Sequence, residues 1–110
     1  MNSKLLVVLS TAEKDKAVTG ILYATNAIKN EWLPDVKVYF FGPFEKLVAE
    51  DPEVQQWALP LIERQTPVAC KFISDSDGVS EKLTQLGVQV EYIGELISNA
   101  IKDGYVPMVF

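Results

Sequence analysis

The run Leu5-Leu-Val-Val-Leu9 is apolar at every position and is closed by Ser10-Thr11. A strand covered on both faces of a parallel sheet is apolar throughout, whereas a half-exposed strand alternates apolar and polar residues. The run therefore predicts a strand that is buried on both faces. Four more strands are predicted where β-branched and aromatic residues gather between turn residues, at 36–41, 67–72, 88–92 and 105–110.

Segments with apolar residues at helical spacing separate these strands. They predict helices at 14–32, at 44–50, from 52 onward, at 78–86 and at 94–102. Alternation of strands and helices with short connections implies a mostly parallel sheet with helices on both faces. We therefore expect a single three-layer α/β/α domain over residues 1–110, with about five strands in an order that the sequence does not determine.

The composition narrows the classes of function. The 110 residues are 48% hydrophobic and 23% charged, which suits one packed domain. With 15 acidic against 10 basic residues, the net charge is −5. Nucleic acids and anionic membranes are poor partners for such a surface. A lone cysteine and the lack of a long apolar segment favour a cytoplasmic protein.

The chain contains no histidine. This excludes Ser-His-Asp and Cys-His catalysis and the metal sites that need imidazole. The acidic segment around Asp75 and Asp77 does not fit a calcium loop, because Ile73 and Thr84 fall where carboxylate ligands are required. We expect no metal and no organic cofactor. Glu45, Glu50 and their acidic neighbours at 51–53 are interpreted as solvated helix starts.

The single cysteine, Cys70, is the strongest candidate for chemistry. It lies near the carboxyl end of a predicted strand, where open α/β sheets place their ligands. A thiol beside a helix start tends toward thiolate. The backbone N–H groups of Gly78, Val79 and Ser80 are expected to steady an anion there, and Ser74 to hydrogen-bond the sulfur.

Several motifs of the chain resemble the DsrE/DsrF-like (TusD-like) family of sulfur-relay proteins. The similar features are a strand ending in Cys70 followed by Ser74, the pair Gly78-Val79, and the strand Gly87-Val-Gln-Val90. The strand at 36–41 and the closing segment also look like the family. The resemblance implies a small α/β subunit that forms trimers, hexamers or hetero-oligomers, with a persulfide carried on Cys70.

Two hypotheses follow. The first is a sulfur-carrier or sulfurtransferase-like subunit that holds a persulfide on Cys70 and relays it from a donor to an acceptor thiol. The alternative is a non-catalytic oligomeric module that binds a small ligand or a protein, with Cys70 packed in the core. Exposure of the thiol would favour the first, and burial under apolar side chains the second. The apolar end at 105–110 predicts an inner strand or a subunit contact.

Overall fold

The computed structural model describes residues 3–110, which contain one five-stranded parallel sheet. In chain order the strands are β1 (Lys4–Leu9), β2 (Asp35–Phe40), β3 (Val68–Cys70), β4 (Gln89–Glu91) and β5 (Tyr105–Val109). Their order in the sheet is β4-β3-β2-β1-β5. The α/β fold predicted from the sequence is confirmed.

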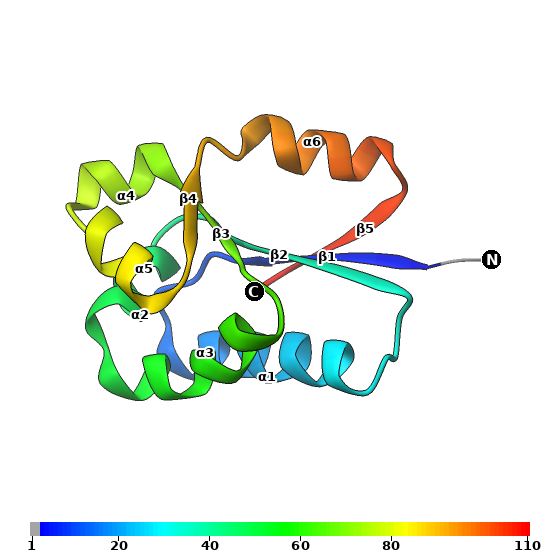
Figure 1. Ribbon diagram of the computed structural model, residues 1–110, viewed down its shortest axis with the longest axis horizontal. Coiled ribbons are helices and arrows are strands. Elements are labelled where there is room, and N and C mark those ends of the chain that lie inside the picture. Colours follow the sequence, from blue (N-terminus) through cyan, green and yellow to red (C-terminus); the bar gives the residue numbers. More distant parts are fainter. Residues whose placement is uncertain (1–2) are drawn as a thin grey trace.

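Helices cover both faces of the sheet and one of its ends. They are α1 (Lys14–Lys29), α2 (Phe44–Glu50), α3 (Pro52–Arg64), α4 (Lys71–Asp77), α5 (Ser80–Leu86) and α6 (Gly94–Lys102). In Figure 1, α1 and α3 lie below the sheet and α6 lies above it. The short helices α2, α4 and α5 gather at the end where the strands finish. None of the helices within residues 3–110 is both long and apolar enough to cross a membrane.

The apolar strand β1 contributes to both halves of the core. Its residues Leu5, Val7 and Leu9 belong to a large cluster with α1, α2 and α3, while Leu6 and Val8 belong to a smaller cluster on the other face. All five side chains are buried, as expected for a central strand. We call the smaller group the second cluster; its buried members are Leu6, Val8, Tyr39, Cys70, Ile93, Ala100 and Tyr105.

The segment after Cys70 differs from the prediction. The strand stops at Cys70, and the chain turns at once into α4, where a turn-rich stretch was expected. Gly78 ends this helix in the left-handed conformation, with φ at 70°. Its N–H and that of Val79 donate to the carbonyls of Asp75 and Ser74, which satisfies the last turn and offsets the low helix propensity of the serines and aspartates.

The chain end also differs from one expectation. The last strand, β5, lies at an edge of the sheet, so the prediction of an inner strand is wrong. Val106 and Val109 are 60% and 63% exposed. The final residue is held nonetheless, because the carbonyl of Phe110 accepts hydrogen bonds from the N–H groups of Ser10 and Thr11 at 2.8 and 3.0 Å.

Candidate functional site

A cavity of about 820 Å³ opens at the carboxyl end of the sheet. Parallel α/β sheets bind their ligands in this position. We call it the edge cavity. Its apolar wall consists of Ala12, Pro43, Leu47, Pro52 and Ile73. Its charged lining consists of Lys46, Glu50, Asp51 and Asp77.

Cys70 does not line this cavity, although Ile73, three residues further along the chain, does. The side chain of Cys70 is 7% exposed and is packed in the second cluster with Tyr39 and Ile93. A buried cysteine of this kind behaves as a small apolar side chain until it is uncovered. The thiol therefore needs a local opening before it can react.

One side chain connects the thiol's surroundings with the edge cavity. Ile73, on the first turn of α4, packs against the second cluster and also lines the cavity. A smaller cavity of about 450 Å³, the side cavity, lies between β4 and α6. Leu96 is in the corresponding position there, since it packs against the same cluster and lines the side cavity. Ile73 and Leu96 thus stand between the thiol's cluster and the two cavities.

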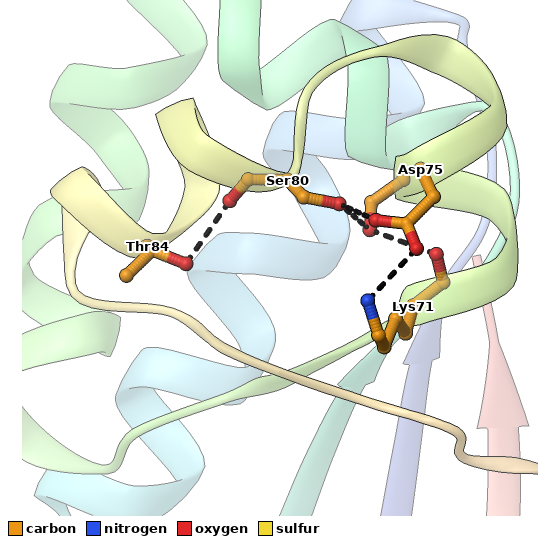
Figure 2. Close-up of polar contacts among 5 residues, drawn as sticks. Lys71, Asp75, Ser80 and Thr84 are labelled. Carbon is orange, nitrogen blue, oxygen red and sulfur yellow. Dashed lines mark hydrogen bonds and ion pairs between the residues drawn. The ribbon is translucent and has the colours of Figure 1, made fainter.

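The other residues predicted to assist the thiol are engaged elsewhere. Ser74 Oγ lies 2.6 Å from Ser80 Oγ and 3.2 Å from the carbonyl oxygen of Lys71. Ser80 Oγ donates to Asp75 (Figure 2). The N–H groups of Gly78 and Val79 close α4. Within residues 3–110 no hydrogen bond reaches the sulfur of Cys70, so the expected anion cradle is not assembled around it.

Lys71 and Asp75 form an ion pair on the outer side of α4. Lys71 Nζ lies 2.8 Å from Asp75 Oδ2, one helical turn away (Figure 2). The hydrogen bond from Lys71, followed by that from Ser80, holds the pKa of Asp75 below its usual value. The carboxylate of Asp75 therefore binds Ser80 at the start of α5 as well as Lys71.

Glu45 is the residue that the sequence analysis missed. It was interpreted as part of a solvated helix start, yet its side chain is fully buried. Gly42 N–H donates to its Oε2 at 3.2 Å, while Oε1 has no hydrogen-bond partner among residues 3–110. Burial, reinforced by the charge of Asp77, raises the pKa of Glu45 to about 7, against the lowering effect of the N–H groups of Gly42 and Cys70.

Local backbone geometry explains how Glu45 reaches this place. Gly42 follows β2 with φ at 117°, a conformation that L-residues rarely adopt. A Cβ on Gly42 would lie 2.8 Å from Ser10 Oγ, so only glycine fits between the ends of β1 and β2. Phe44 then inserts into the core and sets α2 so that Glu45 points inward. The signal in the sequence was the Gly42-Pro43-Phe44 turn directly after a buried strand.

The acidic residues do not form a metal site in the part of the chain that the structure describes. No group of three or more histidine, cysteine, aspartate or glutamate side chains within residues 3–110 is arranged to hold a metal ion. Lys14 pairs instead with Asp51 and Glu53, at 3.3 and 2.9 Å.

Comparison with known proteins establishes the fold but not an activity. No family model and no curated protein matches the chain. A solved structure of BT1422, a conserved protein of unknown function from Bacteroides thetaiotaomicron, superposes with a TM-score of 0.90 at 28% identity. The match covers 98% of this chain and 95% of that one. MTH1491, a protein of unknown function from Methanobacterium thermoautotrophicum, matches with a TM-score of 0.77 at 14% identity, covering 99% and 100% of the two chains.

The position of Ile73 leads to a prediction about access to the thiol. Replacing Ile73 by alanine is expected to raise the rate at which a small alkylating reagent modifies Cys70 by about tenfold, because it removes the side chain between the thiol's cluster and the edge cavity. The measurement is intact mass after timed alkylation of the folded protein.

The control is Ile97→Ala, since Ile97 packs against the same cluster without lining the edge cavity. Leu96→Ala tests the side cavity in the same way. Equal rates for Ile73→Ala and Ile97→Ala would contradict the assignment of the edge cavity as the route to the thiol.

Proposed function

We propose that the protein is a sulfur-carrier or sulfurtransferase-like subunit that holds a persulfide on Cys70. The observation that carries the proposal is the place of Cys70, at the carboxyl end of β3, with Ile73 between the thiol's cluster and the edge cavity. The resemblance of the segment from Cys70 to Val90 to the DsrE/DsrF-like family supports the same chemistry. The absence of histidine from the chain favours exchange at sulfur over hydrolysis.

The proposed reaction is a pair of exchange steps. In loading, the Cys70 thiolate attacks the terminal sulfur of a donor persulfide, R–S–SH. A new S–S bond forms on Cys70 and the donor S–S bond breaks, so that the donor leaves as the thiolate R–S⁻. In unloading, an acceptor thiolate attacks the outer sulfur of Cys70–S–SH, and Cys70 leaves as thiolate. No external oxidant or reductant is consumed in either step.

Loading is tested by intact mass spectrometry after incubation with inorganic polysulfide. The wild-type protein is expected to gain about 32 Da, the mass of one sulfur atom, in a form that a thiol reductant removes. Cys70→Ser is the matched control and is expected to gain nothing. If the wild-type protein takes up no sulfur and Cys70 is also inert to alkylation in the folded state, the carrier proposal fails.

One observation favours a second function. Cys70 is 7% exposed and lines neither cavity, as expected if the thiol only packs in the core. The edge cavity then binds a small ligand itself. Its apolar wall and its three carboxylates beside one lysine suit an apolar ligand that carries a positive charge. In that case polysulfide leaves the mass unchanged, while a small hydrophobic amine shifts the NMR amide signals of residues such as Gly42 and Lys46.

We also propose that copies of the chain associate into a trimer or hexamer. The family resemblance implies such assembly, and the edge strand β5 supports it. Val106, Met108 and Val109 are exposed there although they are apolar, and a small domain gains core by association. An exposed apolar edge strand is a natural surface for self-association.

A further inference from the structure

Glu45 is the most unusual group in the molecule, and neither proposed function uses it. A carboxyl group that is fully buried, with an oxygen that lacks a hydrogen-bond partner, is rare in native proteins. Such a group is costly when ionised, because its charge is removed from water without full compensation. Its retention beside the candidate site calls for a role.

The contacts of Glu45 join the two structures that flank the thiol. From α2, its carboxylate accepts a hydrogen bond from the N–H of Gly42, two residues after β2, and the N–H of Cys70, directly before α4, lowers its pKa. Its charge also acts on Asp77, the last residue of α4. An ionised carboxylate at Glu45 would attract the N–H at the start of α4 and repel the carboxylate at its end.

Asp77 is the charged group that faces Glu45. In α4, Lys71 and Asp75 are paired with each other. The charged side chains of the other helices packed against α2 are exposed: these are Glu53, Glu63 and Arg64 of α3, and Glu81 and Lys82 of α5. In α2 itself, Lys46 and Glu50 are exposed as well. Lys46 lines the edge cavity together with Asp77, which is itself exposed, so the repulsion between Asp77 and Glu45 is partly screened.

We propose that Glu45 is a positioning residue whose proton keeps α4 closed over Cys70, and whose ionisation lets the end of α4 swing away from the sheet. The helix is suited to this movement. It has 7 residues, about two turns, and its start follows Cys70 directly. It ends at Gly78, where a Cβ would meet nothing within 4 Å. Because Ile73 lies on this helix, the movement opens the thiol's cluster to the edge cavity.

The biological role of this opening, control of sulfur loading by pH, rests on the proposed function. The opening itself does not, because access to a thiol can be measured without any sulfur transfer. The inference is tested on the intact chain by the rate of Cys70 alkylation between pH 5.5 and 8.5, in the wild type and in Glu45→Gln. The ratio of the two rates at each pH largely removes the intrinsic pH dependence of the thiol.

Within this range the expected ratio is lowest at pH 5.5. At pH 8.5 the wild type is expected to react faster by between about fivefold and about a hundredfold, because each pKa unit between the closed and open forms is a factor of ten. Asp77→Asn is expected to reduce the ratio, and the exposed Glu81→Gln to leave it unchanged. The protection factors against hydrogen exchange, which remove the intrinsic pH dependence of the amides, are expected to fall in α4 but not in α1 over the same range.

Two results would overturn the inference. One is a ratio that does not change with pH. The other is a wild-type rate that rises with urea as steeply as global unfolding does, since a local opening exposes little surface. If the ratio rises as expected while polysulfide adds no mass, the proton-controlled opening stands and the carrier function fails. If polysulfide adds mass but the ratio of alkylation rates does not change with pH, the carrier function stands and the proton-controlled opening fails.

Discussion

The wild-type protein is expected to lose stability as the pH rises from 4.5 to above 7, and replacing Glu45 by glutamine is expected to abolish this loss. The folded-state pKa of Glu45 is raised from its ordinary 4.5 to about 7. A raised pKa means that the folded state binds the proton more tightly than the unfolded state. The stabilisation is therefore complete below pH 4.5 and is lost as pH passes through 7, by about 3 kcal/mol in total.

Urea unfolding of both proteins at several pH values measures this effect. The difference in unfolding free energy between wild type and Glu45→Gln should change with pH in favour of the variant. Glu81→Gln is the control, because Glu81 is exposed and its removal should leave the slope as it is. A constant difference in unfolding free energy between wild type and Glu45→Gln from pH 5 to pH 8 would show that ionisation of Glu45 does not destabilise the folded protein.

Replacing Phe44 by alanine is expected to cost about 3–5 kcal/mol of unfolding free energy, the largest effect predicted for a single side chain here. Phe44 is fully buried, and its ring packs edge-on against Phe40 with centroids 4.7 Å apart. It anchors the start of α2 to the end of β2. Its loss leaves a cavity in the large core cluster and frees the helix that carries Glu45.

Phe72→Ala is the matched control, since the same side chain is 72% exposed on α4. It is expected to change the unfolding free energy by less than about 0.5 kcal/mol. Chemical denaturation of the two variants checks the pair. Similar losses for Phe44→Ala and Phe72→Ala would contradict the packing described for α2.

The fold could be predicted because its signals are local. The continuous apolar run at β1 and the helical spacing of apolar residues between the strands indicate the α/β alternation directly. The segment at α4 could not be predicted, since serines and aspartates favour turns in isolation. Its helix depends on the left-handed cap at Gly78 and on burial of Ser74, which are tertiary features. The position of β5 at an edge likewise depends on pairing with β1.

The site could be predicted only in part. The sequence correctly indicates that Cys70 lies near the carboxyl end of a strand, because the apolar run and the turn residues that follow are local, but the strand ends at Cys70 and not at Phe72. It does not show that the thiol is covered, since Tyr39 and Ile93 come from distant parts of the chain. Glu45 was missed for a similar reason. An acidic residue near acidic neighbours suggests a solvated surface, and only the turn at Gly42 and the anchor at Phe44 direct it inward.

The proposed function requires that Cys70 accepts sulfur and passes it on. The most direct measurement loads the protein with polysulfide, removes the excess, adds a small acceptor thiol and follows intact mass with time. We expect a gain of about 32 Da that depends on Cys70 and then disappears as one equivalent of sulfane sulfur appears on the acceptor. A protein that gains no mass, or in which Cys70→Ser gains as much, would contradict it.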